Sequence, residues 1–190
     1  MSLLLCFSGQ IGSGKSSVSA AVAQALGWPR TGFGDYLRAA IARRGGDPND
    51  RQSLQDLGQT LVDADPDAFC RDVLAAGGFT PGDDFIIDGI RHIGIFEILA
   101  RVSQPSDAKL LFLGAGEAVR AGRITSRTDA ADFARASAHP VEAELNRALP
   151  EFANGHIDAD QPLDSVLEDV LKVSIRRGPP CLACERPLLR

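Results

Sequence analysis

The strongest chemical signal in the chain is a glycine-rich stretch around residue 12. Gly9, Gly14, Lys15 and Ser16 satisfy the spacing G-x-x-x-x-G-K-[ST], and Gly12 adds a further glycine. Glycines let the backbone curl so that successive N–H groups point at an anion, and the N-terminus of a following helix strengthens the field there. The lysine then reaches the β and γ phosphates of a polyphosphate, and the serine hydroxyl reaches Mg²⁺. We therefore predict a polyphosphate site formed by Gly9, Gly12, Ser13, Gly14, Lys15, Ser16 and Ser17.

An acidic residue ends a second apolar run, in the segment FIIDGIRH at residues 85–92. A carboxylate at the carboxyl end of a strand beside such a loop holds Mg²⁺ directly or through water. We therefore predict that Asp88 shares the metal with Ser16. Gly89 allows a ligand to approach closely, and Arg91 brings a cation to the same crevice. An aspartate that only ends a strand is the alternative.

A third segment, TGFGDYLRAAIARRG at residues 31–45, carries a possible acceptor site. Asp35 opens a helix here, and Arg38 lies one turn further on. Two functions are open for Asp35. It is a good N-cap, or its carboxylate lies beside an acceptor, where it orients a hydroxyl or phosphate or serves as general base. Other polar candidates for an acceptor pocket are scattered: Tyr36, Arg43, Arg44, Gln55 and Arg71.

Three arginines follow in the segment VRAGRITSRTDAADFAR. Arg120, Arg123 and Arg127 are spaced three and four apart, which places them on one side of a helix. Such a stripe is either a solvated face or a lid that folds over the phosphates and supplies charge to the transition state. An arginine supplied in this way is worth about 10³ to 10⁵ in rate.

The elements that must position these residues alternate along the chain. Strand patterns occur at 3–8, near 31, and at 84–88, 109–113 and 155–158. Helical patterns occur at 15–26, 35–44, 51–63, 66–76, 93–102, 116–125, 140–148 and 163–176. Strands separated by helices predict a parallel sheet covered on both faces, with ligands beyond the carboxyl ends of the strands. The predicted fold class is α/β: a P-loop NTPase three-layer αβα sandwich with about five parallel strands and a small helical lid.

Composition and charge exclude several other classes. The chain has 190 residues, enough for one domain that buries roughly 70% of its unfolded surface. With 25 acidic and 20 basic residues and a net charge of −5, it lacks the basic excess of a nucleic-acid surface. No apolar run approaches the roughly 18 residues that a membrane span needs, and no basic leader precedes the first strand. We therefore expect a cytoplasmic protein without nucleic-acid or membrane partners.

Three of these segments carry a family resemblance. FSGQIGSGKSS, at 7–17, resembles the P-loop of dephospho-coenzyme A kinases and nucleoside monophosphate kinases. GDYLRAAIARRG, at 34–45, resembles the adenylate kinase helix whose arginine binds the acceptor phosphate. IIDGIR, at 86–91, resembles the strand that reads D-G-x-P-R in that family. The likeness extends from about residue 3 to residue 176.

The resemblance implies that Arg38 and Arg91 bind the acceptor phosphate and that Asp35 lies beside the acceptor. The chain also departs from the adenylate kinase pattern. No proline lies between Asp88 and Arg91, and the glutamine that reads adenine is absent, with Ile95 in its neighbourhood. With the lid arginines that the resemblance also implies, the predicted catalytic residues are Lys15, Asp35, Asp88, Arg123 and Arg127.

The same likeness divides the chain into a kinase domain and a tail. We expect the domain at 1–176, with acceptor-binding helices at about 35–80 and the lid at about 120–138, and a tail at 177–190. Cys6 and Cys70 lie inside a predicted strand and helix and are expected to be buried thiols. In the tail, Cys181 and Cys184 form C-x-x-C without a second ligand pair, so we predict neither a metal site nor catalysis there.

These observations favour an ATP-dependent kinase that transfers the γ-phosphoryl group to a small phosphorylated metabolite, such as a nucleotide or a dephospho-coenzyme A-like acceptor. Its cofactors would be ATP and Mg²⁺. The alternative is an ATP-binding regulatory or switch protein without a small-molecule acceptor. A GTPase is disfavoured because no lysine follows an asparagine, as N-K-x-D requires. The sequence leaves the acceptor's identity and the oligomeric state open.

Overall fold

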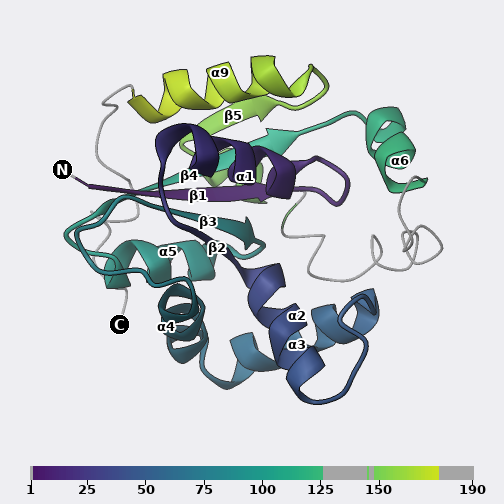
Figure 1. The fold of residues 1–190 in the computed structure, drawn as a ribbon, viewed down its shortest axis with the longest axis vertical. Helices are drawn as coiled ribbons and strands as arrows, with labels where there is room; N and C mark the ends of the chain where they lie inside the picture. Colours follow the sequence, from purple (N-terminus) through teal and green to yellow (C-terminus); the bar gives the residue numbers. More distant parts are fainter. Residues whose placement is uncertain (1, 126–144, 146–147, 176–190) are drawn as a thin grey trace.

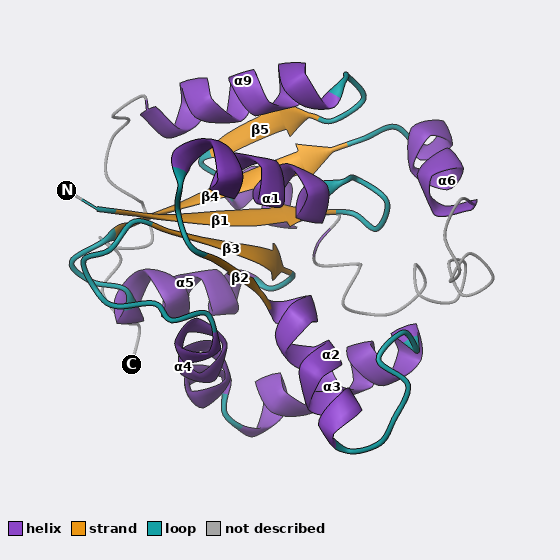
Figure 2. Cartoon of the chain, viewed as in Figure 1, coloured by secondary structure: helices purple, strands orange, loops and turns teal. Residues whose placement is uncertain are grey.

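The structure is a computed structural model that describes residues 2–125, 145 and 148–175 (Figure 1). A parallel sheet of five strands runs through this described part in the order β2-β3-β1-β4-β5 (Figure 2). Every strand that the sequence predicts is present, and the predicted α/β fold class is confirmed. The strands are β1 (Leu3–Gly9), β2 (Arg30–Gly32), β3 (Phe85–Ile90), β4 (Asp107–Gly114) and β5 (Gly155–Asp158).

The central strand, β1, is covered on both faces. Leu5 and Phe7 pack into one hydrophobic core, whereas Leu4 and Cys6 pack into another on the opposite face. All four side chains are fully buried. Because successive side chains of a strand point to opposite faces, a strand buried on both sides needs a continuous apolar run. This is the reason why the first strand reads LLLCF.

Helices form the two outer layers (Figure 1). One face carries α1 (Lys15–Leu26) and α9 (Leu163–Ile175), and the other carries α4 (Pro66–Ala76) and α5 (Ile93–Val102). None of the described helices is long and apolar enough to cross a bilayer. Three further helices of the described part lie beyond the carboxyl ends of the strands: α2 (Phe33–Arg43), α3 (Arg51–Ala64) and α6 (Glu117–Thr125).

Two helices of the acceptor side begin at capping aspartates. The Asp50 carboxylate accepts hydrogen bonds from the backbone N–H groups of Gln52 and Ser53, at the start of α3. Asp65 caps α4 in the same way through the N–H of Ala68, directly before Pro66. These caps set the helix boundaries on the side of the sheet where the acceptor pocket was predicted.

The start of α2 differs from the prediction. This helix begins at Phe33 with Gly32 as its N-cap, so the alternative in which Asp35 caps it is wrong. The physical reason is that β2 runs into the helix without a loop, which leaves Asp35 inside the first turn. The helix predicted at 140–148 and the lid at 120–138 lie largely outside the described residues, and the tail at 177–190 lies wholly outside them.

We expect Cys70 to resist alkylation in the folded protein. Cys6 and Cys70 are buried free thiols, as predicted. Burial, followed by the charge of Asp67, raises the pKa of the Cys70 thiol to about 12. Because the thiolate is the reactive form, iodoacetamide at pH 8 should label Cys70 at least about 100-fold more slowly in the folded protein than in denaturant. Peptide mass spectrometry measures both rates, and equal rates would contradict the burial.

Candidate nucleotide and acceptor site

The loop between β1 and α1 has the geometry of an anion site. Gly14 is the N-cap of α1 in a left-handed conformation, with φ +86°, and Gly12 has φ +82°. Only glycine adopts such values without strain. A Cβ at Gly12 would also lie 2.8 Å from Ile124 Cδ1 and 2.9 Å from Arg120 O. The loop therefore packs closely under α6, and its backbone N–H groups lead into the N-terminus of α1.

Two arginines of the predicted stripe contact this loop from α6. Arg123 donates to the carbonyl of Ser13 at 3.1 Å and to that of Ala159 at 2.7 Å, and Arg120 donates to the carbonyl of Ile11 at 3.5 Å. In a trans peptide the C=O and the next N–H point in opposite directions. The N–H groups that follow these carbonyls therefore point away from α6. Arg127 lies outside the described residues.

Lys15 and Ser16 begin α1 at the mouth of the loop. The Lys15 ammonium lies 3.4 Å from the carbonyl of Gln10, and the Ser16 side chain is exposed. Ser17, also predicted as a loop contact, is exposed one position further along. Ser13 is buried, and its hydroxyl has no hydrogen-bond partner within the described structure. The open side of the loop thus combines the Lys15 ammonium with the Ser16 hydroxyl.

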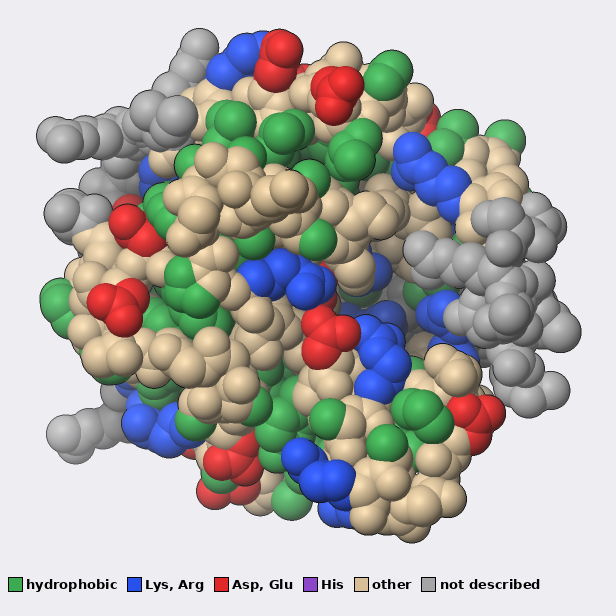
Figure 3. Space-filling view, viewed as in Figure 1, with side chains coloured by type: hydrophobic (Ala, Val, Ile, Leu, Met, Phe, Trp, Pro, Cys, Tyr) green, Lys and Arg blue, Asp and Glu red, His purple; other side chains and the backbone are tan. Residues whose placement is uncertain are grey.

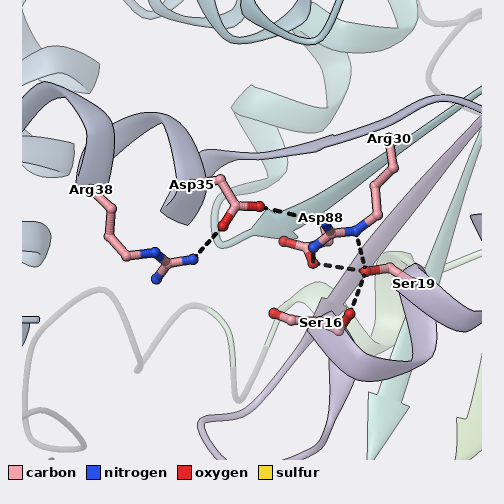
Figure 4. A network of polar contacts seen from close by, with 6 residues as sticks. All are labelled: Ser16, Ser19, Arg30, Asp35, Arg38 and Asp88. Atoms are coloured by element: carbon pink, nitrogen blue, oxygen red, sulfur yellow. Dashed lines mark hydrogen bonds and ion pairs between the residues drawn. The ribbon is translucent and has the colours of Figure 1, made fainter. Parts of the chain in front are cut away.

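Asp88 lies in the second half of β3, which continues to Ile90 and so extends two residues beyond the predicted strand end, and it takes part in a polar network (Figure 4). Its Oδ2 accepts from the Ser19 hydroxyl at 2.8 Å and from Arg30 Nη2 at 2.6 Å. The Ser19 hydroxyl also lies 3.1 Å from the carbonyl of Ser16. Only 6% of the Asp88 side chain is exposed. The structure therefore links Asp88 to the Ser16 backbone through Ser19, a residue that the sequence analysis did not single out.

Asp35 lies on the acceptor side of the same network. Its carboxylate accepts from Arg38 and forms a 3.5 Å ion pair with Arg30. Asp35 and Arg38 are both 46% exposed, so this pair is partly solvated. The guanidinium of Arg38 lies over Gly34 at the edge of the pocket described next. Arg38 is thus oriented by the carboxylate three residues before it.

A cavity of about 590 Å³ joins the loop to helices α2 and α3. Figure 3 shows lysine and arginine side chains gathered around a hollow on this face. Gln55, one of the scattered candidates, lines the cavity, whereas Tyr36, Arg43, Arg44 and Arg71 do not. Its lining includes the charged residues Lys15, Arg38, Arg51, Asp88 and Arg91 and the hydroxyl residue Ser16, and its apolar wall includes Phe33, Leu37, Leu54, Val62, Phe69 and Ile95.

The cavity concentrates positive charge. Burial, followed by the nearby charge of Arg51, lowers the pKa of Arg91 to about 10. Arg51 begins α3, and the sequence analysis missed it because no motif connects it to Arg91. Among the lining residues, four lysine and arginine side chains face one aspartate. The cavity as a whole therefore has an excess of positive side chains, which favours an anionic ligand.

The oxygen donors beside the loop suit Mg²⁺. Ser16 and Asp88 offer a hydroxyl and a carboxylate to the same cavity, and Mg²⁺ prefers such hard oxygen ligands. Within the described ranges no three His, Cys, Asp or Glu side chains form a metal cluster. Mg²⁺ is commonly held by one or two protein oxygens together with water and substrate phosphates, so these two residues fit the ion.

Known proteins share this fold. No protein-family profile matches the chain. A UPF0200 protein of Aeropyrum pernix is 32% identical over 106 residues, and the chain spans about half (52%) of the length of this curated relative. A gluconokinase from Sinorhizobium meliloti 1021 is 23% identical, with a TM-score of 0.57, over 92% of this chain and 91% of that one.

Two shikimate kinases are also similar. The enzyme from Bacteroides thetaiotaomicron is 14% identical, with a TM-score of 0.59, over 90% of this chain and 98% of that one. The enzyme from Aquifex aeolicus is 13% identical, with a TM-score of 0.54, over 90% and 95%. The predicted resemblance to P-loop kinases is therefore confirmed at the level of the fold.

We expect Gly12→Ala to destabilise the protein. A left-handed alanine costs about 1 kcal/mol, and its Cβ would clash with the backbone oxygen of Arg120, which cannot swing aside. Urea unfolding should show a loss of about 1–3 kcal/mol. Gly122→Ala is the matched control, because Gly122 lies inside α6 with open space around it, and a helical alanine is favoured. Equal stability of the two variants would contradict the observed packing of the loop.

Proposed function

We propose that this protein is an ATP-dependent phosphotransferase that moves the γ-phosphoryl group of ATP to a small phosphorylated metabolite. The observation that carries the proposal is the shared cavity, with the glycine-rich loop, Lys15 and Ser16 at one end and Arg38, Arg51 and Arg91 at the other. Donor and acceptor phosphates would meet inside it. Transfer of a phosphoryl group needs positioning and charge stabilisation above all.

The nucleotide end of the cavity would supply the charge stabilisation that phosphoryl transfer needs. Backbone N–H groups of the loop and the N-terminus of α1 would bind the phosphate chain, and Lys15 would bridge the β and γ phosphates. Ser16 and Asp88 would hold Mg²⁺, which neutralises charge on the phosphate oxygens when it is bound. Arg120 and Arg123 support the loop through its carbonyls. A catalytic contact of Arg123 or Arg127 with the phosphates remains a prediction.

The acceptor end favours an anionic ligand. A dianionic phosphate between Arg91 and Arg51 would offset the burial and the repulsion from Arg51, which together lower the pKa of Arg91. The aromatic side chains of Phe33 and Phe69 would contact the organic part of the acceptor. The gluconokinase and shikimate kinases are named for small organic acceptors, which supports an acceptor of this size.

A phosphorylated acceptor also accounts for the ion pair that Asp35 forms with Arg38. The phosphate of such an acceptor is largely ionised at neutral pH, since its second pKa is about 6. Where this phosphate is itself the nucleophile, as in a nucleoside monophosphate, an ionised phosphate oxygen attacks the γ phosphorus without losing a proton, the bond from that phosphorus to the β–γ bridging oxygen breaks, and ADP leaves. Asp35 would then orient Arg38, with which it forms an ion pair, rather than act as general base. An ATP switch without an acceptor would not need this second end of the cavity.

A cytoplasmic location fits this proposal. ATP and Mg²⁺ are supplied there, and the reducing environment keeps thiols such as Cys6 and Cys70 free. The partner is a small molecule, and neither a nucleic acid nor a membrane is needed for the reaction.

The direct test is ADP formation with Mg²⁺-ATP and a panel of acceptors. Nucleoside monophosphates, dephospho-coenzyme A and other phosphorylated metabolites are compared with their unphosphorylated forms. We expect acceptor-stimulated ADP release with a phosphorylated compound, and a loss of at least about 100-fold in Lys15→Ala, because an ammonium at the β and γ phosphates is removed. Lys172→Ala, at an exposed position on α9, is the control and should retain full activity. ADP release that no acceptor stimulates would overturn the proposal.

Arg91 at the acceptor end of the cavity should control the affinity for the acceptor. We expect Arg91→Met to raise KM for the acceptor about 10- to 100-fold, since a charge-assisted hydrogen bond to phosphate contributes about 1.5–3 kcal/mol. Arg101→Met is the matched control, because Arg101 pairs with Asp67 on the surface of α5. Steady-state kinetics at saturating ATP measure both variants. An unchanged acceptor KM in Arg91→Met would remove Arg91 from the acceptor site.

A further inference from the structure

Arg30 occupies the centre of the polar network between the two ends of the cavity (Figure 4). Each nitrogen of its guanidinium faces a different partner. Nε donates to the Ser19 hydroxyl at 2.8 Å, Nη2 to Asp88 Oδ2 at 2.6 Å, and Nη1 faces Asp35 Oδ2 at 3.5 Å. The three partners come from α1, β3 and α2. One side chain at the first residue of β2 thus connects three other elements.

The two carboxylates that Arg30 contacts lie close to each other. An added Cβ on Gly32 would lie 2.6 Å from Asp88 Oδ1 and 3.1 Å from Asp35 Oδ2. Gly32 pairs with Asp88 across the β2–β3 ladder and is also the N-cap of α2. Both acids therefore approach the same point of the backbone, where their like charges repel. Arg30 supplies the positive charge that allows them to remain there.

Burial makes this charge necessary for Asp88 in particular. Only 6% of the Asp88 side chain and 22% of the Arg30 side chain are exposed. A buried carboxylate that loses its partner is strongly unfavourable. The Ser19 hydroxyl accepts from Arg30 and donates toward Asp88 or toward the Ser16 carbonyl. The guanidinium thereby sets the direction of the carboxylate relative to the first turn of α1.

We propose that Arg30 is a positioning residue of the phosphoryl-transfer site. Its guanidinium holds the Asp88 carboxylate where it can bind Mg²⁺, and it holds the Asp35 carboxylate where it can orient Arg38 toward the acceptor. The inference rests on the proposed function, in which Asp88 and Ser16 hold Mg²⁺. Arg30 acts through these carboxylates and does not contact the reacting atoms. Its planar fork satisfies three partners at once, which the single ammonium of a lysine cannot reproduce.

The test separates nucleotide binding from metal dependence. Calorimetry measures ATP affinity in Mg²⁺ and in EDTA for the wild type, Arg30→Met, Arg30→Lys and the control Arg101→Met. We expect Arg30→Met to bind ATP in EDTA within about twofold of the wild type, because the loop amides are unchanged. In Mg²⁺ its affinity should fall about tenfold, since the metal-side carboxylate is no longer held in place. Arg30→Lys should recover part of this loss, and Arg101→Met should show none.

A double-mutant cycle tests whether Arg30 acts through Asp88. We expect Arg30→Met with Asp88→Asn to lose no more Mg²⁺-dependent affinity than Asp88→Asn alone, because both changes remove the same function. With the acceptor present, Arg30→Met should lower kcat about 10- to 100-fold and also raise the acceptor KM, through Asp35 and Arg38. Independent, additive losses in the cycle would overturn the inference.

Stability is measured in parallel to identify a purely structural role. If Arg30→Met lowers Tm but leaves the Mg²⁺ dependence of ATP affinity as in the wild type, Arg30 only supports the fold and the inference is wrong. If Arg30→Met does not fold, Arg30→Lys supplies the same comparison. Absence of phosphoryl transfer in the wild type would overturn the proposed function, whereas the calorimetric comparison would still decide whether Arg30 positions Asp88.

Discussion

Parallel pairing of β1 with both β3 and β4 is the constraint on which the site depends. Since β1 has neighbours on both sides, its carboxyl end lies beside theirs. Phe7 pairs with Asp88 in β3, and Gly9 pairs with Leu113 in β4. The glycine-rich loop and Asp88 are thus brought to one edge of the sheet although about 75 residues separate them. The two cores that bury β1 hold this register in place, because a shift by one residue would exchange its buried faces.

Charge is distributed unevenly over the molecule. The chain carries a net charge of −5, yet the cavity beside the loop is lined by lysine and arginine with a single aspartate among them. Both carboxylates at the edge of β2, Asp35 and Asp88, are paired with guanidinium groups. Pairing reduces their repulsion toward phosphate. The site is therefore attractive to anions despite the acidic character of the whole chain.

Local patterns were sufficient for much of the fold and part of the site. The loop was found because its glycines and Lys15 lie at fixed spacing, and Asp88 was found because it ends the apolar run Phe85–Ile87, although β3 itself continues to Ile90. The arginines of α6 were expected at one side of a helix, and Arg120 and Arg123 do contact the loop. Their guanidinium groups donate to the carbonyls of the loop, however, and the packing of α6 after β4 decides that they face these carbonyls. Helical spacing alone does not specify that packing.

Residues that act through tertiary contacts escaped the sequence analysis. Arg30 belongs to a strand of three residues, and Ser19 looks like an ordinary residue of an amphipathic helix. Arg51 follows a capping aspartate and comes near Arg91 only because α3 packs so that both residues line the same cavity. None of them belongs to a motif with fixed spacing, so their roles become visible only when the elements are packed.

The sequence by itself determined the strand and helix order, the glycine-rich loop and the acidic residue of β3, because hydrophobic period, glycine content and short-range spacing are local properties of a chain. The tertiary structure alone decided which guanidinium balances which carboxylate, where α2 begins, and that the glycine-rich loop, α2 and α3 line one cavity. Those features depend on distances between segments far apart in sequence, and burial sets the strength of each charge pair only after the segments have come together.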